Sequence, residues 1–207
     1  MTMRTLDVAA IVLAAGRASR FSGGAEGRTK LVETVDGKPL VRLAAEAALG
    51  SGARPVVVVT GHARDAVMSA LDGLDVSEAP NPRYAEGIAS SVAAGVAALP
   101  AECAGALILL ADMPRVDAAL CGTLADVFLA MADVDAIVPV VDGRRGNPAL
   151  LSRRLFADAM RLTGDEGARK LLAKPGLKVV EVEVAGSSAG LDIDTPEALA
   201  ALRASKE

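Results

Sequence analysis

Short apolar segments alternate with alanine-rich amphipathic segments along nearly the whole chain, and this alternation is the feature that most constrains the fold. The apolar segments predict strands at Val8–Leu13, Pro55–Thr60, Val76–Ala79, Ala106–Leu110, Ala136–Val140 and Lys178–Val184. The amphipathic segments predict helices at Pro39–Leu49, Ala63–Leu71, Gly87–Leu99, Asp117–Met131, Ser152–Arg161, Asp165–Ala173 and Thr195–Ala204. Nearly continuous apolar strands between helices are typical of a parallel sheet that is buried on both faces. We therefore expect one α/β domain over residues 1–207, with a Rossmann-like three-layer arrangement around a mostly parallel central sheet.

One stretch departs from this alternation. The segment "VDGRRGNPALLS", between Val140 and Ser152, predicts a turn followed by a short extra strand. In open α/β sheets, ligands bind at the carboxyl ends of the strands. The loops after the first, third, fourth and fifth predicted strands are the unusual ones, so we expect them to converge on one binding face.

The composition argues against several classes of function. Hydrophobic residues make up 52% of the chain, with no Trp and one Tyr, which predicts an aliphatic core. The net charge is −4 and no basic block occurs, which argues against a dedicated nucleic-acid-binding protein. Cys103 and Cys121 lack the spacing of metal ligands, and the sequence shows neither a signal-peptide pattern nor an apolar run of transmembrane length. We expect a cytoplasmic protein with reduced thiols and no membrane partner.

The first predicted strand continues directly into a glycine-rich, cationic loop. The stretch "LAAGRASRFSGGAEGRTKL" runs from Leu13 to Leu31. Glycines such as Gly16 let backbone N–H groups approach a ligand, and the side chains of Arg20 and Lys30 suit phosphate oxygens. The spacing matches neither a Walker phosphate loop nor a dinucleotide-binding fingerprint. The loop therefore predicts phosphate binding of another kind, with a plain turn as the alternative.

Three aspartates are candidate metal ligands. Asp112 is the first polar residue after the fully apolar strand in "LILLADMPRV", where a carboxylate can hold Mg²⁺ together with phosphate oxygens and water. The alternative is a turn or a helix-capping aspartate. Asp192 and Asp194, in "GLDIDTPEAL", share one strand face. Capping of the next helix explains Asp194 or Thr195, but it does not explain Asp192.

A turn and a helix start follow the third predicted strand, in "NPRYAEGIASSVAAGV". Asn81 begins the turn, Gly87 opens the helix, and Ser91 lies in its first turns. Small hydroxyl residues at a helix start can bind an anion or the edge of a base. The alternative is that they serve only in capping and packing.

Two further stretches carry polar residues that could meet a second substrate. Arg145 and Asn147 lie in "GRRGNPALL", which either binds an acceptor phosphate or forms a hairpin with a solvated, charged tip. Asp165 lies in "TGDEGARKLL" at a predicted helix start. Complementarity with the helix dipole explains an acidic residue there without any functional role.

Together and in this order, these stretches resemble the bacterial nucleotidyltransferases related to molybdenum cofactor cytidylyltransferase and molybdenum cofactor guanylyltransferase. The matching stretches span Val12 to Leu199 and are "VLAAGRASRF…TKL", "DGKPLV", "VVVVTGH", "NPRYAEGIASSVAAGV", "ALILLADMP", "GRRGNPALL", "GDEGARKLL" and "LDIDTPEAL". The Gly-Asn-Pro and Gly-Asp-x-Gly-Ala-Arg stretches resemble the cytidylyl branch. The chain departs from the family at Ala18, where Ser is usual, and at Phe21-Ser22, where Met or Phe precedes Gly.

The resemblance implies Mg²⁺-dependent transfer of a nucleoside monophosphate from an NTP to a phosphorylated acceptor, with release of pyrophosphate. Carried over by position, the catalytic residues are Arg20, Lys30 and Asp112, and the nucleotide-binding residues are Leu13, Ala14, Ala15, Gly16, Arg20, Lys30, Asn81, Gly87, Ser91 and Asp112. The acceptor-binding residues are Arg145, Asn147 and Asp165, and the metal ligands are Asp112 with Asp194 or Asp192. The strand end Ala14-Ala15-Gly16 resembles the cytidylyl version, whereas the guanylyl branch tends to have Ala-Gly-Gly, so CTP is favoured.

The chemistry of the residues agrees with this interpretation. Nucleotidyl transfer requires an acceptor oxygen held in line with the α-phosphorus and neutralisation of charge, which Mg²⁺, Arg and Lys supply. A phosphate acceptor is largely ionised at neutral pH, so no strong general base is needed. The leading hypothesis is a cytidylyltransferase acting on molybdopterin cofactor, with a molybdoenzyme as a further partner. The alternatives are another NTP or another phosphorylated acceptor, such as a sugar phosphate, or a non-catalytic nucleotide- or cofactor-binding accessory protein for molybdoenzymes.

Overall fold

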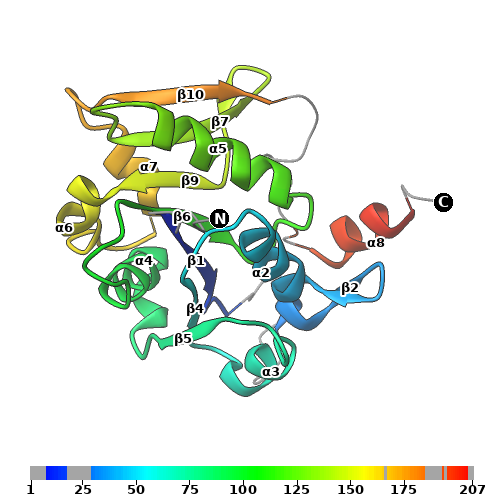
Figure 1. Ribbon diagram of the computed structural model, residues 1–207. Helices are drawn as coiled ribbons and strands as arrows, with labels where there is room; N and C mark the ends of the chain where they lie inside the picture. Colours follow the sequence, from blue (N-terminus) through cyan, green and yellow to red (C-terminus); the bar gives the residue numbers. More distant parts are fainter. Residues whose placement is uncertain (1–7, 18–28, 166, 185–192, 194, 205–207) are drawn as a thin grey trace, which may run out of the picture.

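A central sheet organises the computed structural model, which describes residues 8–17, 29–165, 167–184, 193 and 195–204 (Figure 1). The strand order is β10-β7-β9-β6-β1-β4-β5, with β8 paired to β7. The strands are β1 (Val8–Ala14), β4 (Val56–Thr60), β5 (Ser77–Pro80), β6 (Gly105–Leu110), β7 (Ala136–Val141), β8 (Arg144–Arg145), β9 (Ala149–Ser152) and β10 (Val179–Glu183). The pairs β1–β4, β1–β6, β4–β5 and β7–β10 are parallel, whereas β9 is antiparallel to both of its neighbours. The prediction of a mostly parallel sheet is confirmed.

Helices cover both faces of this sheet. One face packs against α2 (Leu40–Gly50), α3 (Arg64–Ser69) and α5 (Ala118–Ala130), and the other packs against α4 (Ile88–Ala97), α6 (Phe156–Ala159) and α7 (Gly167–Leu172). Successive residues of β1 alternate between the two apolar clusters, and every one of them is buried. A strand buried on both faces has no polar face to show, which explains the unbroken apolar run in the sequence. The three-layer arrangement is therefore also confirmed.

The region around β9 differs from the prediction. The expected helix Ser152–Arg161 is wrong at its start, because Ser152 ends β9 and a 3-10 helix, η3 (Arg153–Leu155), precedes α6. Hydrogen bonding of β9 to both β6 and β7 extends the strand through Ser152, where the sequence predicts the start of a helix. Because β9 runs antiparallel, its beginning lies at the edge of the sheet where the parallel strands end. The extra strand after Val140 is confirmed, and β8 adds a short hairpin to β7.

The sequence pattern also leaves out one small element. A hairpin of β2 (Thr34–Val35) and β3 (Lys38–Pro39) precedes α2, and α8 (Pro196–Ala204) packs beside it. Leu199 and Leu202 of α8 form a separate apolar cluster with residues of this region. None of the helices among the described residues is both long and apolar enough to cross a membrane.

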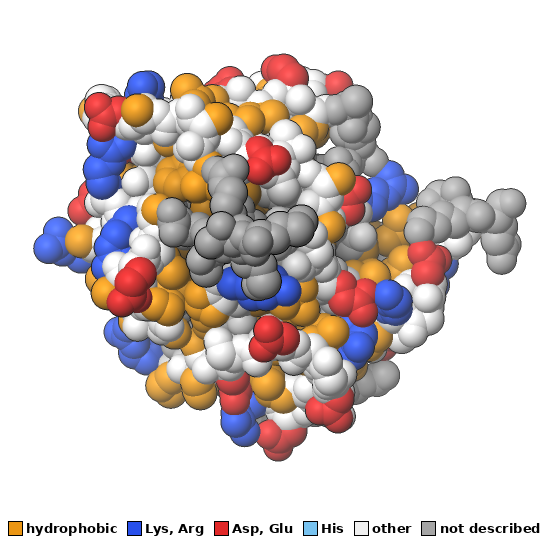
Figure 2. Space-filling model, viewed as in Figure 1, with side chains coloured by type: hydrophobic (Ala, Val, Ile, Leu, Met, Phe, Trp, Pro, Cys, Tyr) orange, Lys and Arg blue, Asp and Glu red, His pale blue; other side chains and the backbone are white. Residues whose placement is uncertain are grey.

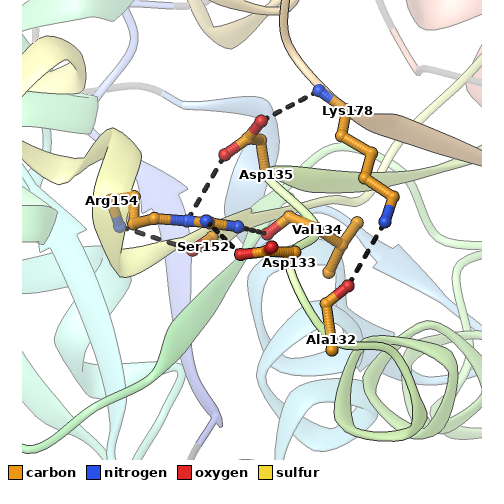
Figure 3. Close-up of polar contacts among 7 residues, drawn as sticks. All are labelled: Ala132, Asp133, Val134, Asp135, Ser152, Arg154 and Lys178. Carbon is orange, nitrogen blue, oxygen red and sulfur yellow. Dashed lines mark hydrogen bonds and ion pairs between the residues drawn. The ribbon is translucent and has the colours of Figure 1, made fainter.

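A polar network holds the amino-terminal edge of β7 to β9 and β10 (Figure 3). The Asp135 carboxylate accepts the backbone N–H of Lys178 at 2.8 Å and lies 3.4 Å from Nε of Arg154. Arg154 also donates to the carbonyl of Val134 at 2.9 Å and to Asp133 at 2.8 Å. Asp135 is well covered, with 18% of its side chain exposed, whereas Asp133 is 83% exposed. These contacts are structural, since they lie at the opposite edge from the carboxyl ends of the parallel strands.

The replacement Asp135→Asn is expected to destabilise the fold by about 1–2 kcal/mol, because asparagine keeps one oxygen acceptor but loses the charge that strengthens the bond to the Lys178 N–H and pairs with Arg154. Thermal or denaturant unfolding measures this change. The matched control is Asp133→Asn, which removes an exposed ion pair to the same arginine and should change stability by less than about 1 kcal/mol. Equal losses from the two replacements would contradict the structural role given to Asp135.

Candidate active site

A cavity of about 390 Å³ opens at the carboxyl edge of the sheet. Segments that are far apart in the sequence form its walls: the ends of β1 and β6, the 3-10 helices η1 (Lys30–Val32) and η2 (Tyr84–Glu86), and the start of α4. The lining residues are Leu13, Ala15, Gly16, Arg17, Lys30, Leu31, Tyr84, Ala85, Gly87, Ile88, Ser91, Leu110, Asp112 and Asp165. The loops after the first, third and fourth predicted strands thus converge, as expected.

Lys30 and Asp112 form an ion pair inside this cavity. The Lys30 Nζ atom lies 2.8 Å from Asp112 Oδ2, and the two side chains are 8% and 22% exposed. Thr29 positions Lys30 by accepting the backbone N–H of Leu31, which begins the η1 turn. The structure therefore brings together a cation and a carboxylate that the sequence separates by more than eighty residues.

The alternative interpretation of Asp112 as a helix cap does not hold. Asp117 caps α5 by accepting the backbone N–H of Leu120 at 2.8 Å. The backbone carbonyl of Asp112 accepts the N–H of Ile193 at 2.9 Å, while its carboxylate points to Lys30 in the cavity. A carboxylate that is free of capping and open to a cavity fits Mg²⁺, which takes one or two protein carboxylates and completes its shell with phosphate and water. The part of the chain that the structure describes holds no cluster of three His, Cys, Asp or Glu side chains around a metal position.

The nucleotide-binding residues predicted at the end of β1 do not all face the cavity. Leu13, Ala15 and Gly16 line the cavity, whereas Ala14 is fully buried in the apolar cluster on the opposite face. This follows from the alternation of side chains along a strand. A Cβ atom at Gly16 would meet no heavy atom within 4 Å, so the described surroundings leave open space beside this backbone.

Two further lining residues, Arg17 and Tyr84, are functional candidates that are not among the predicted site residues. The guanidinium of Arg17 lies over the Tyr84 ring, 5.4 Å from its centroid. The sequence carries two signals for them: Arg17 belongs to the cationic loop after the first strand, and Tyr84 is the single tyrosine of a chain without Trp. On the face seen in Figure 2, acidic and basic side chains are interspersed among hydrophobic ones.

The start of α4 forms the wall between this cavity and a second one. Gly87 has a φ of +107°, and a Cβ atom there would overlap the backbone of Gly164 and lie 2.6 Å from an Asp165 carboxylate oxygen. The backbone N–H of Ala89 donates to the Gly164 carbonyl at 3.1 Å. The loop that carries Asp165 therefore sits directly on the helix start, and only glycine allows this approach.

Asn81 lies behind the cavity wall and does not line it. It is 3% exposed, and its side-chain amide donates to the hydroxyls of Ser90 and Ser91 at 2.9 and 3.0 Å. Ser91 does line the cavity. Of the polar residues predicted at this turn and helix start, the structure thus puts Ser91 on the cavity surface and Asn81 in the layer beneath it.

The second cavity, of about 230 Å³, brings together all three predicted acceptor residues, Arg145, Asn147 and Asp165. It shares Leu13, Ile88, Leu110 and Asp165 with the first cavity, so the two adjoin. Asn147 reaches this edge because it precedes the antiparallel strand β9. Arg145 lies in the exposed β7–β8 hairpin and pairs with Glu181 at 2.7 Å. Most of the remaining lining is apolar, with Arg169 as an additional cation.

Three predicted site residues, Arg20, Asp192 and Asp194, lie outside the described residues. Thr195 caps α8, since it accepts the backbone N–H of Ala198 at 3.2 Å. Capping therefore requires neither Asp192 nor Asp194. A cysteine nucleophile is disfavoured at Cys121, because burial raises the pKa of its thiol to about 12.

Comparison with known proteins gives one family. The family model described as "MobA-like NTP transferase domain" matches residues 10–180. The "Nicotine blue oxidoreductase" of Paenarthrobacter nicotinovorans is 30% identical over 195 residues, which is 92% of this chain and 93% of that protein. The "Bifunctional protein GlmU" of Pelobacter propionicus is 33% identical over 156 residues, which is 75% of this chain and 33% of GlmU. The chain thus spans about a third of the length of that relative.

A solved structure shares the whole fold. Rv0371c from Mycobacterium tuberculosis H37Rv superposes with a TM-score of 0.80 at 27% identity, covering 95% of this chain and 98% of that one. That protein has also been solved in complex with manganese.

Proposed function

The chain belongs to the family of MobA-like NTP transferase domains, and from this premise we propose that it transfers CMP from CTP to a phosphorylated acceptor, with release of pyrophosphate. The observation that carries the proposal is the pair of adjoining cavities with a shared wall. A transfer between two substrates requires both reacting atoms to meet, and Asp165 lines both cavities. The larger cavity takes the nucleotide, and the smaller one takes the acceptor.

The charged end of the larger cavity suits the triphosphate. Lys30, together with Arg20, meets the phosphates, and Asp112 holds Mg²⁺, which supplies neutralisation of charge on the α-phosphate and the leaving pyrophosphate. The resemblance adds Asp192 or Asp194 as a second ligand, and both lie outside the described residues. In the free protein, the ion pair lets Lys30 and Asp112 neutralise each other until both ligands arrive.

The smaller cavity suits an acceptor with an apolar body and a phosphate group. Its largely apolar walls fit the body, while Arg145 and Asn147 offer hydrogen-bond donors to the phosphate. A phosphate monoester is largely ionised at neutral pH, so the attack requires orientation and no strong base. We propose molybdopterin cofactor as the acceptor and a molybdoenzyme as the partner that receives the product.

The relative named as an oxidoreductase supports a second candidate function. Its similarity covers nearly the whole of both chains. The present sequence carries no dinucleotide-binding fingerprint after β1, which favours nucleotidyl transfer. Oxidation of NADH or NADPH by the purified protein, with no pyrophosphate formed from any NTP, would support the redox function instead.

The proposed activity predicts a preference for CTP over GTP. We place the base beside Ala15, which lines the cavity and is buried, so that its methyl group narrows the space available to a purine. Pyrophosphate release is measured with Mg²⁺, each of the four NTPs and phosphorylated acceptors, molybdopterin cofactor and sugar phosphates among them. We expect kcat/KM for CTP to exceed that for GTP at least about tenfold, and we expect Ala15→Gly to reduce this ratio. Equal use of GTP and CTP by the wild type would reject the base assignment.

Lys30 is expected to bind the triphosphate rather than the nucleoside. Lys30→Met keeps the apolar stem but removes the charge, so it should weaken binding of Mg²⁺·CTP by about tenfold or more and weaken CMP much less. Isothermal titration calorimetry measures both affinities. Lys38→Met is the matched control, because Lys38 pairs with Glu46 at an exposed site. If Lys30→Met weakened CTP and CMP by the same factor, the lysine would act on the fold of the loop.

A further inference from the structure

A buried hydrogen-bond network fixes how the Ser91 hydroxyl can meet a ligand. The Oδ1 atom of Asn81 accepts the backbone N–H of Arg83 at 3.0 Å, which sets the orientation of the side-chain amide. Its Nδ2 atom therefore faces Ser90 and Ser91 and donates to both hydroxyl oxygens. An amide nitrogen can only donate, so each serine oxygen acts as an acceptor towards Asn81.

The two serines differ in what their own protons do. The single proton of the Ser90 hydroxyl is shared between the carbonyls of Arg83 and Gly87, at 2.9 and 2.8 Å. Within the described part of the chain, the Ser91 hydroxyl donates to no acceptor. Ser91 is 5% exposed, and the surface it retains lines the larger cavity. Its proton is therefore available to a group that enters this cavity.

We propose that Ser91 is a fixed hydrogen-bond donor to an acceptor atom in the nucleoside part of the bound nucleotide, and that Asn81 is the positioning residue that keeps it a donor. The inference rests on the proposed function, because it takes the larger cavity as the nucleotide site. Among the described residues, Arg17 and Lys30 are the cations that line this cavity, and Asp112 is the proposed ligand of Mg²⁺, so the triphosphate has partners other than Ser91.

The ligand class follows from this polarity. Because Asn81 occupies the acceptor side of Ser91, the position favours a carbonyl oxygen or an unprotonated ring nitrogen and disfavours an amino group. Cytosine carries both kinds of acceptor next to each other on its ring. A site that holds a fixed donor loses affinity when the donor is removed, since the ligand atom then remains unpaired.

A double-mutant cycle tests the coupling between the two residues. Ser91→Ala removes the donor, and Asn81→Asp keeps the bond to the Arg83 N–H but turns the Ser91 proton towards the new carboxylate. Each replacement should lower the affinity for Mg²⁺·CTP by about tenfold in calorimetric titration. The double variant should bind Mg²⁺·CTP no more weakly than either single variant. Ser91→Ala should also lower the affinity for CMP by the same factor as the affinity for CTP, in contrast with Lys30→Met.

Ser90→Ala is the matched control. Ser90 bonds to the same amide but does not line the cavity, so this variant should lose thermal stability and retain the affinity for CTP within about twofold. If Ser90→Ala lost as much affinity as Ser91→Ala, or if the losses in the cycle added to about a hundredfold, the donor role would be overturned. Should Asn81→Asp fail to fold, the comparison of Ser90→Ala with Ser91→Ala decides alone. A wild type that binds CTP no better than Ser91→Ala overturns this inference only, and a wild type that binds no NTP overturns the proposed function as well.

Discussion

Replacing Asp112 by asparagine is expected to lower kcat/KM for CTP by about a thousandfold while leaving the fold intact. The amide keeps the shape of the side chain but removes the negative charge that holds Mg²⁺, whose stabilisation of transition-state charge is worth several kcal/mol. The backbone carbonyl that accepts the Ile193 N–H is unchanged by this replacement. Pyrophosphate release at saturating Mg²⁺ measures the effect, and circular dichroism checks the fold.

The matched control lies five residues further along the same loop. Asp117 is a carboxylate with a structural partner, since it caps α5 through the N–H of Leu120. Asp117→Asn should therefore change stability by less than about 1 kcal/mol and leave turnover unaffected, because asparagine is also a good helix cap. Near-wild-type activity of Asp112→Asn at saturating Mg²⁺ would reject Asp112 as the metal-holding residue.

A binding measurement separates the metal from the nucleotide. In Asp112→Asn, the affinity for CTP should no longer rise when Mg²⁺ is added, whereas in the wild type it should rise. The variant also removes one partner of Lys30, whose side chain is 8% exposed. The prediction therefore concerns the dependence on Mg²⁺, since the metal-free affinity reports both the lost ion pair and the altered charge of the cavity.

The sequence is most informative where one local rule decides the structure. β1 is an unbroken apolar run because it is buried on both faces, and the polar residues that follow β1 and β6 lie at one edge because the two strands are parallel. The same strand also shows what the sequence cannot predict. Ala14 and Ala15 are adjacent and identical in type, so the sequence does not tell which of them faces the cavity. The direction that puts Ala15 in the cavity and Ala14 in the core depends on the register and packing of the whole sheet.

Contacts between distant segments are beyond such local rules. The sequence predicts a nucleotide-binding role for Asn81 and Ser91. It cannot show that Asn81 lies in the layer behind Ser91 and does not line the cavity. The loop of Gly164 packs on the start of α4, where the backbone N–H of Ala89 donates to the Gly164 carbonyl. The two residues are more than seventy positions apart in the sequence, so no local pattern predicts this contact. The sequence predicts a short strand before Ser152, but only the position of β9 between β6 and β7 makes it antiparallel and extends it through Ser152.

Gly87 gives the second large expected effect. Gly87→Ala should destabilise the fold by about 3 kcal/mol and lower kcat/KM for CTP by about a hundredfold. The residue has a φ of +107°, where an L side chain is strained, and the added methyl group would overlap the backbone of Gly164. The loop must then move away from α4 and take Asp165 with it, which opens the wall that the two cavities share. A displacement of about 1 Å in a reacting group is enough for a loss of this size.

Gly122 is the control that isolates this cause. It lies within α5, and a Cβ atom there would meet no heavy atom within 4 Å. Gly122→Ala should therefore stabilise the protein by about 0.5–1 kcal/mol, because alanine favours the helix, and it should leave turnover unchanged. Thermal unfolding and steady-state kinetics of both variants make the comparison. If Gly87→Ala were as stable as the wild type, the contact between Gly164 and the start of α4 would not be the feature that sets the spacing of the two cavities.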